Sequence, residues 1–224
     1  MKIRSYQLTI KTDRPLNTHS VSLRGFIGRQ FPHLELLHNH TSDNSLIYTY
    51  PRVLYHVMNG YAIIIGIEEG VDAVKLVVSN LTKLLLNNTE YKIVEKIDTE
   101  SEIDFGIIKN QLIYSFLAPW LALNERNFEQ YQQLEGWTKK KDFLEKILIG
   151  NIISMSKGLG YTVSEPIKAN IINLREVSTS LKGTPMLGFL GSFSVNFEIP
   201  DYWGVGKSVS RGFGTIKRVE ELGS

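Results

Sequence analysis

Three patterns in the sequence predict an α+β fold made of two tandem ferredoxin-like (RRM-like) domains. The first is a series of strand-like and helix-like runs in the order β-α-β-β-α-β over residues 1–100. The second is a weaker repeat of that order over residues 101–224, and the third is a glycine-rich loop before the last strand-like run. The polar stretch Thr99–Glu102 is the expected boundary between the two domains.

The N-terminal half begins with a strand-like run and then a helix-like run. Residues 3–10 alternate between apolar and polar side chains, which indicates a strand. The helix is expected to begin with a cap at Asn17 or Thr18 and to end at Pro32. Its apolar stripe comprises Leu23, Phe26, Ile27 and Phe31. A polar, histidine-bearing insertion over residues 33–45 follows this helix.

The rest of this half is expected to contain a hairpin, a second helix and a closing strand. Residues 46–50 and 52–58 read as strands, and the turn pair Asn59–Gly60 joins the second of them to residues 61–67. Asn-Gly between two strand-like runs is the strongest short-range hairpin signal. Residues 89–97 form the closing strand. The helix before it is predicted from the apolar stripe Val71, Val74, Val78, Leu81 and Leu85.

The C-terminal half repeats this plan less clearly. A strand is expected over residues 111–117, a polar surface helix over 124–134, and two paired strands over 167–177 and 187–199, joined around Lys182–Pro185. The glycine-rich loop takes the place of most of the last helix. The first long helix of this half is predicted from the stripe Leu144, Ile147, Leu148, Ile152 and Met155.

Composition restricts the possible functions. The chain has 224 residues, of which 42% are hydrophobic, and a net charge of +2, so a polyanion site must be local rather than spread over the whole surface. It has no cysteine, which excludes disulfides, cysteine-based zinc sites and thiol nucleophiles. The N-terminus has a strand pattern rather than that of a signal peptide, and no apolar run reaches the ~18 residues that span a bilayer. We therefore expect a cytoplasmic location and no membrane partner.

The glycine-rich loop lies within Tyr202–Ile216, which combines four glycines, two cations and three aromatic residues. Such a loop can bring backbone N–H groups and cations to phosphates, although the same composition also suits a plain bend. It is not a P-loop, because Asp201 stands where the first glycine is required. It is not a dinucleotide fingerprint either, because Val209 stands at the third glycine position. NTPase and dehydrogenase chemistry are therefore not supported.

The insertion holds a pair of histidines two residues apart, His38 and His40. After Pro32 the segment is expected to be extended, and residues two apart on an extended chain share a face. Two imidazoles can then act as general base and general acid in RNA cleavage by its own 2′-hydroxyl. The charge that builds on phosphorus needs cations, for which the candidates are Arg29, Lys207 and Arg211.

Two other interpretations of the histidine pair stay open. The two imidazoles could hold zinc if His33, Glu35 or Asp43 supplied a third ligand. They could also be ordinary solvated loop histidines. No carboxylate cluster in the sequence suits two-metal nuclease chemistry.

Together the histidine pair and the terminal loop resemble a known protein family. The chain is similar to the "Cas-six" CRISPR-associated endoribonucleases that process precursor CRISPR RNA, and above all to their subtype I-B branch. Five stretches carry the resemblance: residues 23–28, 38–40, 48–55, 65–70 and 204–214.

The resemblance implies a function, a mechanism and a set of residues. It implies two ferredoxin-like domains and metal-independent cleavage within the repeat RNA through a 2′,3′-cyclic phosphate, with no cofactor. It places catalysis on His38 and His40, aided by Tyr48 or Tyr50. It implies CRISPR repeat RNA as the partner, with effector-complex subunits and a second copy of the chain as further partners to test. The RNA-binding positions that it implies are Gly204, Gly206, Lys207, Ser208, Ser210, Arg211 and Gly212.

The chain departs from the family at one point. Where the branch has Tyr-Pro-x-x-Gln-Tyr-Lys, this chain has Leu54 and His56 in place of the Gln and the Lys. The cation beside the scissile phosphate must then be replaced, with His56 as a third imidazole or Arg29 as the candidates. The alternative function is a non-catalytic subunit that binds repeat RNA or serves as a scaffold, and a third is a metal-dependent nuclease.

Overall fold

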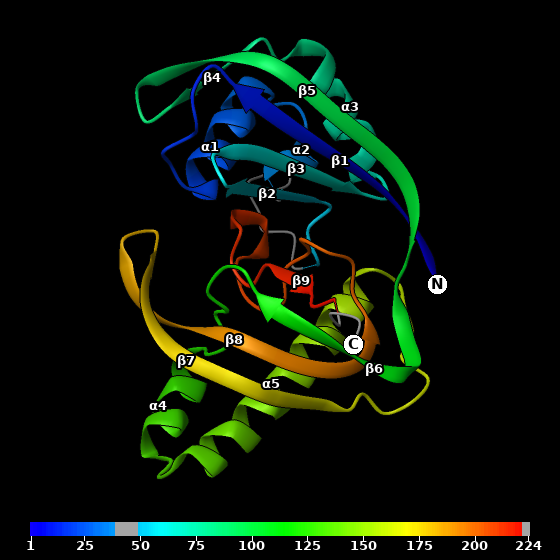
Figure 1. Cartoon of the computed structure of the whole chain (residues 1–224), viewed down its shortest axis with the longest axis vertical. Helices are drawn as coiled ribbons and strands as arrows, with labels where there is room; N and C mark the ends of the chain where they lie inside the picture. Colours follow the sequence, from blue (N-terminus) through cyan, green and yellow to red (C-terminus); the bar gives the residue numbers. More distant parts are fainter. Residues whose placement is uncertain (39–48, 221–224) are drawn as a thin grey trace. The chain divides into compact units, whose positions relative to one another are not determined.

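The computed structural model describes residues 1–38 and 49–220, which form two compact units (Figure 1). The N-terminal unit comprises Lys2–Ile103 together with Ser210–Gly212. The C-terminal unit comprises Asp104–Val209 and the residues from Phe213 onward, together with Met1. The chain therefore returns to the N-terminal unit for three residues of its glycine-rich loop.

The N-terminal unit is a five-stranded sheet with helices packed on it. The strands lie in the order β2-β3-β1-β5-β4. Without β4, this is the strand order and chain order of a ferredoxin-like unit. The strands are β1 (Lys2–Thr12), β2 (Val53–Met58), β3 (Tyr61–Ile67), β4 (Lys83–Leu86) and β5 (Thr89–Asp104). The helices are α1 (Ser20–Gln30), α2 (Glu35–His38) and α3 (Gly70–Asn80).

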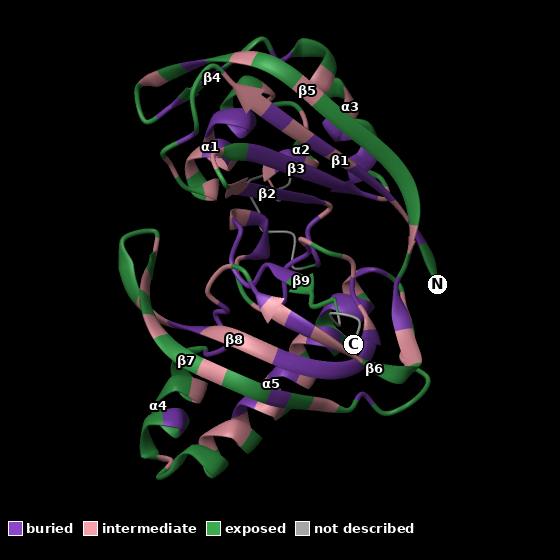
Figure 2. Cartoon of the chain, viewed as in Figure 1, coloured by how far each residue is buried: buried purple, intermediate pink, exposed green. Residues whose placement is uncertain are grey.

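The predicted hairpin between β2 and β3 is present and sets the register of the sheet. Asn59 and Gly60 have φ of 51° and 81°, the positive values that a tight hairpin turn requires. In this register Tyr55 lies opposite Ile64, and both are buried in the core with the apolar stripes of α1 and α3. Figure 2 shows buried residues on the strands β1, β2 and β3 and on the helices α1 and α3.

The predicted stripe of the second helix extends too far. The helix α3 ends at Asn80, and residues 83–86 form the short strand β4 instead. Burial there alternates with a period of two: Leu84 is buried, whereas Leu85 is 46% exposed. Asn87 and Asn88, both at positive φ, turn the chain from β4 into β5, and this tight hairpin draws Leu84 into the sheet. The predicted strand at residues 46–50 lies largely outside the described residues.

The C-terminal unit has a four-stranded sheet in the order β7-β8-β6-β9, which is the same ferredoxin-like order. The long helix α5 packs against β7, and its buried side chains include Leu144, Leu148, Ile152 and Met155, as the stripe predicts. The strands are β6 (Gly106–Phe116), β7 (Ala169–Leu181), β8 (Thr184–Glu198) and β9 (Ile216–Arg218). The helices are α4 (Glu125–Gln133), α5 (Trp137–Gly158) and the 3-10 turn η1 (Val209–Arg211).

The connection between β8 and β9 is the glycine-rich loop. In residues 199–215, all of which the structure describes, the only helical element is η1. The two units therefore share strand order but differ in their last crossover, which is α3 in one and a loop in the other. Among the described helices, none is both long and apolar enough to cross a lipid bilayer.

Candidate functional site

A hollow of about 350 Å³ lies between α1 and α2 of the N-terminal unit. His38, the last residue of α2, forms part of its wall. Arg24 and Arg29 of α1 form another part, so an imidazole and two guanidiniums line one surface depression. Glu35 to His38 are helical rather than extended, so the prediction of an extended chain is wrong for this stretch. His40 and Tyr48 lie outside the described residues.

The backbone at His38 is held by side chains from two other elements. The guanidinium of Arg24 donates to the His38 carbonyl, and the Tyr55 hydroxyl donates to the Leu37 carbonyl at 3.2 Å. Both bonds link residues that are 14 or more positions apart in sequence, so the end of α2 is fixed by tertiary contacts. The position of His38 is therefore set by the fold and not by the short helix alone.

The imidazole of His38 lies against a glycine of α1. A Cβ at Gly28 would lie 2.7 Å from Nδ1 of His38, closer than a real Cβ can approach. The other ring nitrogen, Nε2, lies 3.3 Å from the Phe31 carbonyl oxygen and donates to it when it carries a proton. Gly28 therefore makes room for the ring, and Phe31 orients it.

Two arginines of the N-terminal unit, Arg24 and Arg211, place positive charge close together. Burial lowers the pKa of Arg24 below its usual value, and the nearby positive charge of Arg211 lowers it further. Burial also lowers the pKa of Arg211, which reaches this unit through the glycine-rich loop. The buried Nε of Arg24 has no hydrogen-bond partner within residues 1–38 and 49–220. Two partly desolvated cations near each other would be stabilised by an anion.

The remaining predicted catalytic residues are placed differently. Arg29 is exposed and shares the hollow with His38. His56 is only 1% exposed and lies in β2, opposite Ile63 of β3. Because it directly follows Tyr55 in the strand, its side chain points to the other face of the sheet. Tyr50 is 8% exposed. The structure thus brings Arg29 to His38 and leaves His56 on the other side of the sheet.

The glycine-rich loop is held by its own backbone hydrogen bonds. The Val205 N–H donates to the Gly214 carbonyl at 2.9 Å, and the Gly214 N–H donates to the Pro119 carbonyl at 2.9 Å. Trp203 is 1% exposed and packs against Phe105, with ring centroids 5.9 Å apart, so it belongs to the core. Several N–H groups of the loop are therefore occupied within the protein.

Its glycines are needed for close packing. Gly206 has φ of +95°, and a Cβ there would lie 2.7 Å from the indole Nε1 of Trp120. A Cβ at Gly214 would lie 2.0 Å from the Val205 carbonyl oxygen. These contacts give the glycines a structural role whether or not RNA approaches them.

The other predicted RNA-binding residues differ in exposure. Lys207 is exposed and lies in the C-terminal unit, whereas Arg211 is half-buried in the N-terminal unit. Ser208 is half-buried, and Ser210 is 7% exposed. Gly204 and Gly212 are buried. Lys207 is thus the most accessible cation of the loop.

Two residues at the site were not singled out by sequence reasoning. Arg24 and Gly28 stand at i and i+4 of α1, so they lie on the same helix face. Both fall within residues 23–28, one of the stretches that carry the family resemblance, but only the fold shows that they contact His38. Within the described residues, no three His, Asp or Glu side chains are close enough to share a metal ion.

The whole chain is similar to known families and structures. Residues 1–104 match the family described as the Cas6b N-terminal domain, and residues 106–219 match the Cas6b C-terminal domain. A protein of Methanocaldococcus jannaschii, described as uncharacterized, is 43% identical over 145 residues, which are 65% of this chain and 98% of that protein.

Solved structures give the same result. A crystal structure of Cas6b is 36% identical, has a TM-score of 0.90, and covers 98% of this chain and 100% of its own. A crystal structure described as CRISPR RNA processing endoribonuclease Cas6b is 33% identical, with a TM-score of 0.78 and coverages of 97% and 100%. A protein described as an RAMP protein that binds different RNA substrates is 13% identical, with a TM-score of 0.59 and coverages of 98% and 100%, and shares the fold.

Proposed function

This chain belongs to the Cas6b family, and from that premise we propose that it cuts precursor CRISPR RNA within its repeats, without a metal ion. The family resemblance supports the substrate, since a relative 33% identical is described as a CRISPR RNA processing endoribonuclease. The observation that carries the chemistry is the position of His38 in a hollow beside two arginines.

The reaction needs two proton transfers and no external nucleophile. One imidazole takes the proton from the 2′-hydroxyl, whose oxygen attacks the adjacent phosphorus. The other imidazole gives a proton to the departing 5′-oxygen, so the products are a 2′,3′-cyclic phosphate and a 5′-hydroxyl. We assign these roles to His38 and His40, because histidine can both accept and donate a proton near neutral pH.

Cations must stabilise the negative charge that builds on the phosphorus oxygens. Arg29 is the better replacement for the lysine that the family has at position 56, because it shares the hollow with His38. The face that His56 occupies favours a structural role for that residue. Tyr48 or Tyr50 would orient the RNA beside the imidazoles.

The glycine-rich loop would bind the RNA backbone. Lys207 is exposed, and Arg211 adds its charge to that of Arg24. Gly204, Gly206, Ser208, Ser210 and Gly212 would shape the loop around these cations. Because the net charge of the chain is only +2, a local cluster of cations must provide the attraction for phosphates.

Two substrates and a chelator test this function. Repeat RNA should be cut in EDTA and end in a cyclic phosphate, whereas RNA with a single 2′-deoxy nucleotide at the cut should bind equally well and stay intact. Loss of activity in EDTA would instead identify a metal-dependent nuclease. Tight binding of the unmodified RNA without cleavage would identify a scaffold subunit. Cutting of the deoxy substrate would rule out attack by the 2′-hydroxyl.

A further inference from the structure

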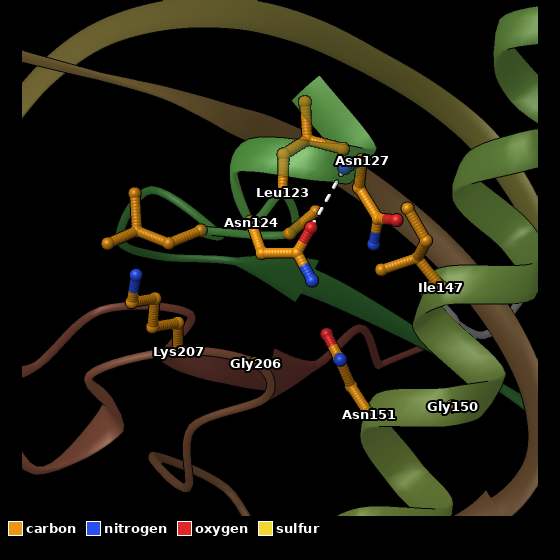
Figure 3. A pocket seen from close by; sticks show the side chains of 10 residues that line it. Leu123, Asn124, Asn127, Ile147, Gly150, Asn151, Gly206 and Lys207 are labelled. Atoms are coloured by element: carbon orange, nitrogen blue, oxygen red, sulfur yellow. Dashed lines mark hydrogen bonds between the residues drawn. The ribbon is translucent and has the colours of Figure 1, made fainter. Parts of the chain in front are cut away.

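A second hollow lies wholly within the C-terminal unit, where the start of α4, the middle of α5 and the glycine-rich loop come together (Figure 3). Its volume is about 380 Å³, within the roughly 300–1,000 Å³ of small-molecule sites. It is distinct from the hollow at His38, with which it shares no residue. Its polar lining consists of Asn124, Asn127, Asn151 and Lys207.

Two of the three asparagines use their acceptor oxygens within the protein. Asn151 Oδ1 accepts from the indole Nε1 of Trp120 at 3.0 Å, and an indole N–H can only donate. Asn124 Oδ1 caps α4 by accepting from the Asn127 backbone N–H at 2.8 Å. In each amide the NH₂ group is then left to donate elsewhere. Figure 3 shows both amides at the hollow, with the cap drawn as a dashed line.

Lys207 adds a positive charge to these donors. Its backbone N–H donates to the Leu121 carbonyl at 3.3 Å, which holds the loop at the edge of the hollow. Its side chain is exposed, and Figure 3 shows it on the opposite side of the hollow from α5. A set of amide donors and an ammonium favours a ligand that has acceptor atoms and a negative charge.

The other side chains of the lining are apolar, and this restricts the class of ligand further. Leu121, Leu123 and Ile147 form apolar parts of the wall. A simple inorganic anion would gain nothing from such a wall, whereas a nucleobase has apolar faces and acceptor atoms at its edge. Proteins recognise unpaired bases of RNA, turned out of their stack, through hydrogen bonds to the base edges together with contacts to the base faces.

Two residues of the lining, Asn151 and Gly206, are held against Trp120 before any ligand binds. Trp120 is fully buried, stacks on Phe116 with centroids 5.3 Å apart, and exchanges two backbone hydrogen bonds with Phe189 of 2.8 and 3.0 Å. Gly206 lies directly against its indole ring. A preformed site saves the entropy of ordering that a flexible one would lose on binding.

We propose that this hollow binds one unpaired nucleotide of the RNA substrate. The base lies against Ile147 and Leu123 with its acceptor edge toward Asn124, Asn127 and Asn151, and the phosphate lies at Lys207. This assignment rests on the proposed function, because it takes the RNA as the ligand. It gives the C-terminal unit a means of reading sequence or shape that is separate from cleavage.

Gly150 offers a way to block the hollow without disturbing the fold. It lies in α5 at the hollow, and a Cβ there would meet nothing within 4 Å. Replacing a helix glycine also removes a residue that costs about 1 kcal/mol in a helix interior. Gly150→Glu therefore places a carboxylate beside the asparagines. Ser154→Glu, exposed one turn farther along α5 and outside the hollow, adds the same charge as a matched control.

The expected result is a loss of affinity with cleavage retained. Gly150→Glu should weaken repeat-RNA binding about tenfold relative to Ser154→Glu, while the cleavage rate at saturating RNA stays within about twofold. Asn127→Ala removes one amide and should weaken binding about threefold. Equal RNA affinities of the Gly150→Glu and Ser154→Glu variants would overturn the inference. If both variants still cleaved the RNA, the proposed function would be unaffected. Absence of RNA binding by the parent protein would instead contradict both.

A series of repeat RNAs, each lacking one unpaired base, tests whether a base enters the hollow. Removal of the base at one position should lower the affinity of the parent protein about tenfold. The Gly150→Glu variant should bind that same RNA nearly as well as it binds the intact RNA. Such non-additivity shows that base and hollow are in contact. Additive losses at every position would show that no base occupies the hollow and would overturn the assignment.

Discussion

The two units of this protein have the same strand order but differ in the connection that leads to the last strand of that order. In the N-terminal unit the second crossover is the helix α3, which satisfies its own backbone and buries Val71, Val74 and Val77. In the C-terminal unit the same connection is a loop that must find partners for its backbone one by one, as Val205 does with Gly214. The loop buries Trp203 and Val205 in place of a helix face.

This difference shows what a sheet requires from its last crossover. Apolar burial over the sheet is needed in both units, but a helix is only one way to supply it. The loop supplies it while leaving Lys207 exposed and sending Arg211 into the N-terminal unit. The proposed division of labour follows: the N-terminal unit cleaves at His38, and the loop of the C-terminal unit binds. Four predictions test that division.

The largest effect is expected for the imidazoles. The double variant His38→Ala, His40→Ala should lose cleavage by a factor of about 100 or more, the usual scale for general acid–base groups, with little change in RNA affinity. Single-turnover cleavage and equilibrium binding measure the two effects. His33→Ala is the control, because His33 is exposed in the same segment. Cleavage by the double variant within about threefold of the parent would place the chemistry elsewhere.

The next effect concerns the stability of the loop. Gly206→Ala should destabilise the C-terminal unit by roughly 2–4 kcal/mol, since it combines an unfavourable φ with overlap on the Trp120 ring. Gly183→Ala measures the cost of a positive φ alone, because Gly183 also has a positive φ (+82°) but a Cβ there would meet nothing within 4 Å. It should cost about 1 kcal/mol. Equal losses for the two variants would show that the contact with Trp120 is unimportant.

Tryptophan fluorescence during urea unfolding can measure these losses in the right unit. All three tryptophans, Trp120, Trp137 and Trp203, belong to the C-terminal unit. The signal therefore follows this unit without interference from the other.

A smaller effect is expected where α1 makes room for His38. Gly28→Ala puts a Cβ 2.7 Å from Nδ1 of His38, and the ring must move. We expect a loss of about tenfold in cleavage rate, because misplacing a catalytic group is costly. Gly25→Ala makes the same change in the same helix but meets Arg29 at an ordinary 3.5 Å, so its rate should fall by no more than about twofold. Equal rates for the two variants would mean that His38 is not a catalytic group.

The smallest effect is expected for the loop cations. Each phosphate neutralised on single-stranded RNA contributes about 0.7 to the slope of log affinity against log salt. Lys207→Ala with Arg211→Ala should therefore flatten that slope by about 1 to 1.5 while leaving the cleavage rate at saturating RNA unchanged. A bracing role for the loop predicts the reverse, with lower thermal stability and an unchanged slope.

The sequence by itself determined most of the fold, because most of the helices and strands follow from local patterns. Apolar alternation marks β1, and the stripe of Leu144 to Met155 marks α5. The turn Asn59–Gly60 is also local, since asparagine and glycine adopt the required positive φ more readily than other residues. The prediction of α3 failed at its end because a residue such as Leu85 fits a helix stripe or a strand equally well.

The sites were decided by the tertiary structure. Sequence pointed to His38 and Lys207 as chemically suitable residues, but nothing local shows that Arg24 donates to the His38 carbonyl or that Gly206 lies on Trp120. The Asn124–Asn151 hollow depends likewise on residues that meet across a helix and a loop. Such contacts join positions 14 to more than 80 residues apart. Local propensity acts over a few residues, so packing of the whole chain alone selects which distant side chains share a cavity.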